Sequence, residues 1–483
     1  MAASMVSLHH AIDFLSFYAI IEPLSGSLGP GSHFRLERND QLMTNMKRLL
    51  ALSLALALCA SLLSGCGGGT TSSGSSSSSG STSASTSQDA SSSASSSQEE
   101  PELMDLSGIT DPYLATSGHS GDTVIAKVGD FDVTADMYLY WLFYGYGYVL
   151  QDYGLLYSDQ DIPWNELDAE GVSLEQVLAD NALYTACYYT LLPHLAEREG
   201  VELDSALAAD LAADYENVKE TLGSEELASY YFWANLMSPE LFQRLYTSGE
   251  FNAQLQQKLF GEDTDGYPTD AEVLDYAENE LGYYRAKHIL LKTVDTTKTV
   301  QNDDGTYGYA PLDQEIVNQK GDLAEELLER INEADDPAAM FDTLMNGYSE
   351  DEGLANNPDG YTTYKGTMVP GFENGALALE EGEISGLVTS QYGYHIIMRL
   401  PLDPADYRGY LVADLMEKKS DEWLEEFGIE ATEVFHNIDP STFCAQARGL
   451  QESAFTTVNE VIVAMQEEMA GAAGSASGSS SQG

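Results

Sequence analysis

Two short stretches predict how the central part of this chain folds: Arg285-Ala286-Lys287-His288-Ile289-Leu290-Leu291 and Gly393-Tyr394-His395-Ile396-Ile397. Each stretch places one histidine inside an apolar, β-branched run, which is the pattern of a buried strand. A single core histidine needs no function. Two histidines on strands that belong to one compact unit instead predict a site built across adjacent strands.

The segments between and around these stretches predict a small α+β domain over residues 281–400. Turn-rich residues 293–318 are expected to form an insertion. The expected order is β-α-α-α-β-β, a small sheet with helices packed on it. The predicted strands cover 283–292, 387–389 and 394–400, and the predicted helices cover 319–332, 337–345 and 372–379.

The flanking regions predict a mainly helical lobe that is interrupted by this domain. Residues 117–280 begin with a small hairpin over 123–133 and continue as capped amphipathic helices. Residues 401–470 are helical again and are expected to pack on the N-terminal helices. The many aromatic residues of the lobe allow two interpretations, as core or as an exposed surface for unfolded chains.

The N-terminal region has the pattern of an export signal. Met46-Lys47-Arg48 precedes an apolar run over 49–63, and Leu63-Ser64-Gly65-Cys66 resembles the lipobox of bacterial lipoproteins. We therefore expect residues 1–65 to be the signal region, with 1–42 a possible over-extended gene start, and Cys66 to be lipidated. The Ser/Gly-rich residues 66–116 are expected to form a tether, and 471–483 a disordered tail.

Charge and cysteine content narrow the classes of function. The formal net charge is −57, and residues 1–66 contain equal numbers of basic and acidic side chains, so the negative charge belongs to the remainder. Such a chain lacks the clustered Lys and Arg that nucleic acids and anionic membranes require. Cys187 and Cys444 remain after Cys59 and Cys66, and the sequence leaves open whether they form a disulfide.

Five segments together resemble parvulin-type (PpiC) peptidyl-prolyl cis-trans isomerases. The flanking lobe, from Ala126-Lys127-Val128 onward, resembles the PrsA- and SurA-type foldases, and the lipobox favours the PrsA type. In chain order, the five segments are His288-Ile289-Leu290-Leu291, Tyr348-Ser349-Glu350-Asp351, Gly366-Thr367-Met368-Val369-Pro370-Gly371-Phe372-Glu373, Leu379-Glu380-Glu381-Gly382-Glu383-Ile384-Ser385 and Gly393-Tyr394-His395-Ile396-Ile397.

The resemblance implies a set of site residues. His288 and His395 match the paired histidines of the family, Asp351 matches a position that holds cysteine or aspartate, and Ser390 matches a neighbouring hydroxyl. Met368, Phe372 and Tyr392 match the apolar surroundings of the proline ring. The residues themselves leave alternatives open: the histidines may also be structural core residues, and Asp351 a solvated acid.

The resemblance also implies a function. The expected protein is a foldase anchored by lipid to the outer face of the bacterial cell membrane, which isomerises X–Pro bonds in unfolded or newly exported proteins. It would need no cofactor and no metal, and it would bind no nucleic acid. The alternative is a non-catalytic holdase that binds unfolded exported chains through the helical lobe.

Overall fold

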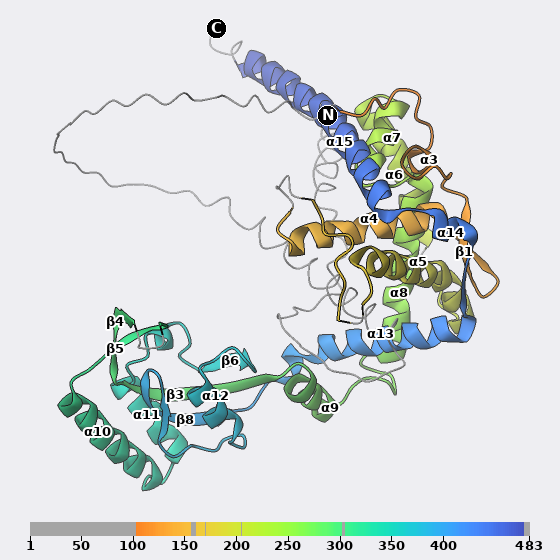
Figure 1. Cartoon of the computed structure of the whole chain (residues 1–483). Helices are drawn as coiled ribbons and strands as arrows, with labels where there is room; N and C mark the ends of the chain where they lie inside the picture. Colours follow the sequence, from red (N-terminus) through yellow and green to blue (C-terminus); the bar gives the residue numbers. More distant parts are fainter. Residues whose placement is uncertain (1–102, 156–160, 170, 204, 302–304, 478–483) are drawn as a thin grey trace, which may run out of the picture. The chain divides into compact units, whose positions relative to one another are not determined.

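The computed structural model describes residues 103–155, 161–169, 171–203, 205–301 and 305–477. Contacts divide the chain into two compact units (Figure 1). The first, here called the helical unit, contains the residues up to Asp265 and those from Leu415 onward, and the second, the sheet unit, is Gly266–Asp414. The predicted signal, Cys66 and the first part of the predicted tether lie outside the described residues.

The helical unit begins with the expected hairpin, in which β1 (Val124–Val128) and β2 (Phe131–Thr134) pair antiparallel. Helices follow whose ends match the capping residues in the sequence. The Ser173 hydroxyl accepts a hydrogen bond from the Gln176 backbone N–H, and Gly200 ends the same helix with a φ of 65°. These helices are α4 (Ala135–Asp152), α5 (Leu174–Glu199), α6 (Ser205–Leu222), α7 (Glu225–Trp233) and α8 (Pro239–Phe260).

The chain returns to the helical unit after the sheet unit. Strand β9 (Ile429–Ala431) pairs antiparallel with β1, which gives a sheet in the order β2-β1-β9. Trp423, Phe443 and Leu450 are buried in the same core as residues of α4 and α5. A helical lobe interrupted by an inserted domain is therefore confirmed. The returning helices are α13 (Arg408–Phe427), α14 (Glu433–Asn437) and α15 (Pro440–Ser477).

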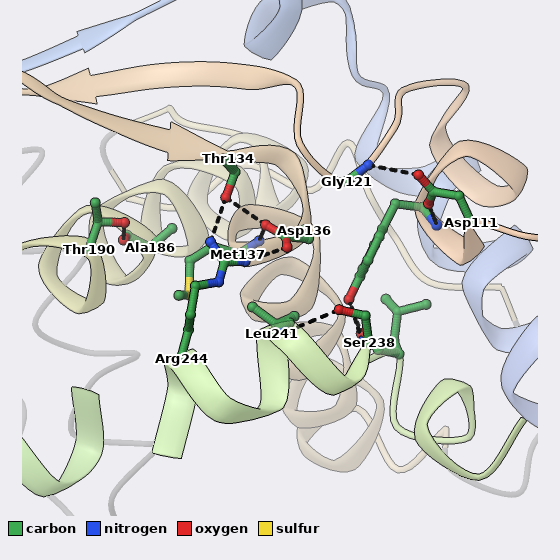
Figure 2. A network of polar contacts seen from close by, with 12 residues as sticks. Asp111, Gly121, Thr134, Asp136, Met137, Ala186, Thr190, Ser238, Leu241 and Arg244 are labelled. Atoms are coloured by element: carbon green, nitrogen blue, oxygen red, sulfur yellow. Dashed lines mark hydrogen bonds and ion pairs between the residues drawn. The ribbon is translucent and has the colours of Figure 1, made fainter. Parts of the chain in front are cut away.

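A polar network joins the hairpin, α4 and α8 of the helical unit (Figure 2). Arg244 of α8 pairs with Asp136 and donates a second hydrogen bond to the Thr134 hydroxyl, over 3.1 Å. Asp136 is only 9% exposed, so its charge needs this partner. In the same view, the Asp111 carboxylate accepts a hydrogen bond from the Gly121 N–H at 3.0 Å. The start of the unit is thus fixed by specific polar contacts.

The structure corrects the predicted end of the tether. Within 103–116, which the sequence placed in the tether, Leu106 and Tyr113 are buried in the core. Tyr113 belongs to α3 (Pro112–Ser117), and the Met104 N–H donates to the Ser453 hydroxyl over 2.7 Å. These partners are far away in the sequence, so local composition could not reveal them. At the other end, α15 continues to Ser477, so the predicted tail 471–483 starts as helix.

The sheet unit contains a four-stranded antiparallel sheet in the order β6-β3-β8-β7. Its first strand covers the predicted residues 283–292. Three strands of this unit were not predicted. One is β6, and the other two are β4 (Val294–Gln301) and β5 (Tyr307–Pro311), which form a hairpin inside the expected insertion. The sheet strands are β3 (Tyr283–Lys292), β6 (Tyr361–Tyr364), β7 (Val388–Ser390) and β8 (Gly393–Leu400), and the helices include α9 (Asp270–Asp275), α10 (Gln314–Asn332), α11 (Pro337–Tyr348) and α12 (Pro370–Leu377).

Helices cover both faces of this sheet, because alternate residues of a strand point to opposite sides. Ile289, Leu291 and Ile396 lie on one face and pack against α10 and α11. Tyr284, Ala286 and Ile397 lie on the other face with α12. The sheet unit starts just before α9, at Gly266, and ends within α13, at Asp414. It is therefore longer at both ends than the domain that the sequence placed at 281–400.

The structure also answers the question that the sequence left open about the two cysteines. Cys187 and Cys444 are both free thiols, and both are buried in the core of the helical unit. Within the described ranges, no helix combines the length and the apolar character needed to cross a membrane.

Candidate active site

The two histidines lie on the α12 face of the sheet, on neighbouring strands. His288 on β3 pairs in register with Ile397, and His395 on β8 pairs with Leu290. The histidines are therefore diagonal neighbours on one face, a separation that ring side chains can bridge. Their Nδ1 atoms are 2.9 Å apart. The prediction of a site across adjacent strands thus corresponds to a direct contact between the two imidazoles.

Hydrogen bonds extend from this pair in both directions. The Nε2 atom of His288 lies 3.0 Å from Oδ2 of Asp351, and Nε2 of His395 lies 2.7 Å from the hydroxyl of Ser390. The Ser390 hydroxyl also accepts the Tyr392 backbone N–H over 3.1 Å. One continuous chain of hydrogen bonds therefore joins β7, β8, β3 and the segment after α11.

The chemistry of the end groups assigns the protons when both imidazoles are neutral. An ionised carboxylate only accepts, so His288 donates from Nε2 to Asp351. Nδ1 of His288 then accepts the Nδ1–H of His395, and Nε2 of His395 accepts the Ser390 O–H. Every polar atom of both rings has a partner in this arrangement.

Burial keeps His395 neutral. Its side chain is only 2% exposed, and this burial, together with the neighbouring His288, lowers its pKa to about 3. The Asp351 carboxylate acts in the opposite direction but does not outweigh the burial. His395 therefore carries no charge at neutral pH, and its unprotonated Nε2 can accept a hydrogen bond from the Ser390 hydroxyl.

Asp351 stays ionised although it is partly buried. Burial alone would raise its pKa, but hydrogen bonds from His288, Tyr361 and the Gly353 N–H hold the pKa well below the usual range. The Tyr361 hydroxyl donates over 2.5 Å, and the Gly353 N–H over 3.0 Å. The site thus contains a fixed negative charge at one end of a neutral histidine pair.

Tyr361 was not among the predicted site residues. It lies on β6 and pairs in register with Ala286, so its side chain is on the same face as His288. Asp351 and burial together raise the pKa of the Tyr361 hydroxyl, which keeps it protonated as a donor. The run Tyr361-Thr362-Thr363-Tyr364 is rich in aromatic and β-branched residues, which favour strands, but four residues are too few to predict a strand by themselves.

An apolar wall adjoins the polar chain. Phe372 of α12 is 3% exposed, and its ring centroid lies 4.9 Å from that of His288 and 5.9 Å from that of His395. Met368 is partly buried against the same cluster. The ring of Tyr392 instead lies against Tyr309 of the β4–β5 hairpin, with centroids 5.7 Å apart. Of the predicted site residues, Tyr392 thus joins the network only through its backbone.

The close approach of α12 to β7 positions Phe372. A Cβ atom on Gly371 would lie 2.2 Å from the carbonyl oxygen of Thr389, so only glycine fits here. The Glu373 carboxylate accepts the Gly366 N–H at 2.9 Å, which ties the segment before α12 to the helix. Among the described residues, no group of three or more His, Cys, Asp or Glu side chains is arranged to hold a metal ion.

Comparisons with known proteins place this site in a family context. Residues 288–400 match the family model described as "Rotamase: PPIC-type PPIASE domain". The chain is 29% identical to the foldase protein PrsA of Halalkalibacterium halodurans over 187 residues, which cover 33% of this chain and 55% of that protein. It is also 29% identical to the PrsA of a Geobacillus species over 208 residues, 43% of this chain and 58% of the relative.

The chain therefore spans about half the length of the curated relatives that it matches. Among solved structures, the crystal structure of PrsA from Bacillus subtilis is similar over 54% of this chain and 87% of that chain, with 20% identity and a TM-score of 0.19.

Proposed function

We propose that this protein is a PrsA-like parvulin foldase, which acts outside the cytoplasm and isomerises X–Pro bonds in exported proteins. The match of residues 288–400 to the PPIC-type peptidyl-prolyl isomerase model and the similarity to PrsA foldases support this proposal. The observation that carries the proposal is the hydrogen-bonded chain Ser390–His395–His288–Asp351 beside the apolar wall of Phe372 and Met368.

These residues suit the chemistry of bond rotation. Rotation about an X–Pro bond is slow because amide resonance gives the bond partial double-bond character. The planar amide carries partial negative charge on oxygen, and this charge decreases as the bond twists. The Asp351 carboxylate disfavours the charge of the planar form if the carbonyl lies near it. Phe372 and Met368 offer apolar contacts for the proline ring.

The histidine pair has a positioning role in this proposal. The rings of His288 and His395 lie against the ring of Phe372. His288 also holds Asp351 in place, because its Nε2–H donates a hydrogen bond to the carboxylate. Hydrogen bonds within the site hold both rings in place. Rotation requires no covalent step, so the site acts through shape and charge.

The test is a peptide isomerisation assay that measures cis-trans exchange by NMR. We expect the wild-type chain to accelerate exchange of a short Ala-Pro peptide, and Asp351→Asn to lower kcat/KM about tenfold or more, because it removes the charge while keeping the shape. The matched control is Glu352→Gln, since Glu352 is the next residue and is largely exposed. An inactive but folded wild-type chain would refute the enzymatic proposal.

The alternative is a holdase, and one feature of the helical unit supports it. Aromatic side chains of α4 and α5 form a cluster that remains partly exposed, including Trp141 and Tyr189, whose centroids are 4.6 Å apart. Unfolded chains bind such surfaces. The wild-type chain and the Asp351→Asn variant can also distinguish the isomerase function from the holdase function. Aggregation suppression retained by Asp351→Asn would show that holding does not depend on the charge of the isomerase site, and loss of suppression in Trp141→Ser/Tyr189→Ser would assign it to the helical unit.

We also propose that the chain is anchored by lipid at Cys66. This proposal rests on Leu63-Ser64-Gly65-Cys66, which lies outside the described residues. A fatty-acid label should enter the wild-type protein in its bacterial host and be absent from Cys66→Ser, which should leave the membrane fraction. Equal labelling of both would contradict the anchor.

A further inference from the structure

The β4–β5 hairpin has an exposed aromatic face to which the proposed isomerase mechanism assigns no role. In β5, Tyr307 is 73% exposed and Tyr309 is 37% exposed. Alternation along the strand puts these two rings on one side, with Pro311. Tyr307 pairs with Gln301 and Tyr309 with Thr299 of β4, so the residues that neighbour the two rings across the hairpin are polar. Exposed aromatic rings of this kind are typical of binding surfaces.

This face is continuous with the active site. The ring of Tyr309 lies against that of Tyr392, at 5.7 Å and an interplanar angle of 36°. The backbone of Tyr392 is bonded on both sides: its N–H donates to Ser390, and its carbonyl accepts the Thr293 N–H over 2.9 Å. Ser390 in turn contacts His395. The base of the hairpin is thus fixed to the residue that ends the hydrogen-bonded chain.

The positive charges on and beside the hairpin are already paired with carboxylates, so they are not available to bind a substrate. Among the described residues of the hairpin, Lys298 is the cation, and it pairs with Asp295 at 2.8 Å. Lys292, at the end of β3, is bonded to Glu352 at 2.8 Å. A phosphorylated or acidic segment would therefore meet no unpaired cation among these residues. Aromatic contact remains as the source of affinity.

We propose that Tyr307 and Tyr309, together with Tyr392, form a second part of the substrate-binding surface, which binds apolar or aromatic side chains flanking the X–Pro bond of an extended polypeptide. The inference rests on the proposed isomerase function and specifies its substrate class. Extended segments with exposed apolar side chains occur in unfolded proteins and are buried in folded ones. The hairpin would therefore select unfolded clients.

The test uses three peptides: a short Ala-Pro peptide, a longer peptide with aromatic residues on both sides of the proline, and the same longer peptide with serine in place of those aromatics. The variant is Tyr307→Ser/Tyr309→Ser in the full chain, and both positions are exposed. The control is Tyr153→Ser, which removes a 43% exposed tyrosine from the helical unit. Both kcat/KM and the Kd of each longer peptide are measured.

We expect the double variant to weaken binding of the aromatic peptide about fivefold and to raise its KM, while short-peptide turnover and the serine peptide stay unchanged. The control should behave as wild type. An unchanged Kd for the aromatic peptide overturns the proposal, as does an equal loss on the short peptide. A wild-type chain that binds the aromatic peptide through these tyrosines but isomerises nothing refutes the enzymatic function and leaves the binding surface supported.

Discussion

At the scale of single residues, the lowered pKa of His395 makes the free energy of unfolding depend on pH. Its pKa is lowered to about 3 in the folded chain, against an ordinary value of 6.5. Between these values the unfolded chain binds a proton that the folded chain does not. Stability therefore falls as the pH drops below 6.5 and continues to fall toward 3, by about 1.4 kcal/mol per pH unit. The lowered pKa of Asp351 adds a loss of the same sign at more acidic pH.

We therefore expect the sheet unit to lose about 2 kcal/mol of unfolding free energy between pH 7 and pH 5 through His395 alone. The measurement is the urea dependence of hydrogen exchange in β3 and β8 at both pH values. His395→Gln should lower stability at pH 7 but remove this part of the pH dependence. His119→Gln, in the helical unit, should change neither. A pH dependence that persists in His395→Gln would show that another group is responsible.

At the scale of elements, the contact between α12 and β7 determines where Phe372 lies. The Cβ atom of Gly371→Ala would approach the Thr389 carbonyl and come within 3.0 Å of the Ser390 Cα, both backbone atoms that cannot turn away. The helix must shift, and overpacking of this kind reduces stability by about 1–3 kcal/mol. The shift would also displace Phe372 from the histidines, so peptide turnover should fall.

The matched control is Gly347→Ala in α11. Its Cβ would meet no atom within 4 Å, and it lies inside a helix, where alanine is favoured by up to about 1 kcal/mol. Urea unfolding followed by hydrogen exchange in the sheet unit should show opposite changes for the two variants. If Gly371→Ala is as stable as wild type, the close approach of α12 does not constrain the site.

Local patterns predicted the elements whose signal is contained in their own residues. The apolar, β-branched runs around His288 and His395 predicted β3 and β8, and the capping residues predicted the ends of α5. Strand β6 is only four residues long and follows polar turns, so its pattern was too short to recognise. Tyr361 was missed with it, since its role depends on register with Ala286 rather than on neighbours in sequence.

The β4–β5 hairpin could not be predicted from the sequence for a different reason. Its residues are polar and mostly exposed, and alternation of apolar and polar residues is therefore weak. The sequence predicted an insertion there but not its strands, nor the contact of Tyr309 with Tyr392. The family resemblance gave the candidate site residues. It could not predict that the Tyr392 ring lies against Tyr309, because Tyr309 belongs to the insertion.

At the scale of the whole molecule, the helical unit is formed from both ends of the chain. Strand β9 completes the small sheet, and Trp423, Phe443 and Leu450 fill the core between helices of the N-terminal part. Burial of each such side chain contributes about 1.5–3 kcal/mol. Together with Leu424, these residues account for a sum comparable with the 5–15 kcal/mol that stabilises a typical domain. The helical unit should therefore depend on residues that follow the sheet unit in the sequence.

We expect a chain that ends at Asp414 to lose the cooperative thermal transition of the helical unit. Strand β1 would lose β9, one of its two partners, and the core would lose the buried side chains of Trp423, Phe443 and Leu450. The sheet unit, Gly266–Asp414, remains complete in that chain and should still resist limited proteolysis. The control is removal of 471–483, which should leave the transition unchanged, because the buried core residues of α15 among those whose burial is described end at Val458. Near-ultraviolet circular dichroism of the three remaining tryptophans (Trp141, Trp164 and Trp233) reports on the helical unit directly. A cooperative transition that survives truncation at Asp414 would mean that residues before the inserted domain fold without those after it.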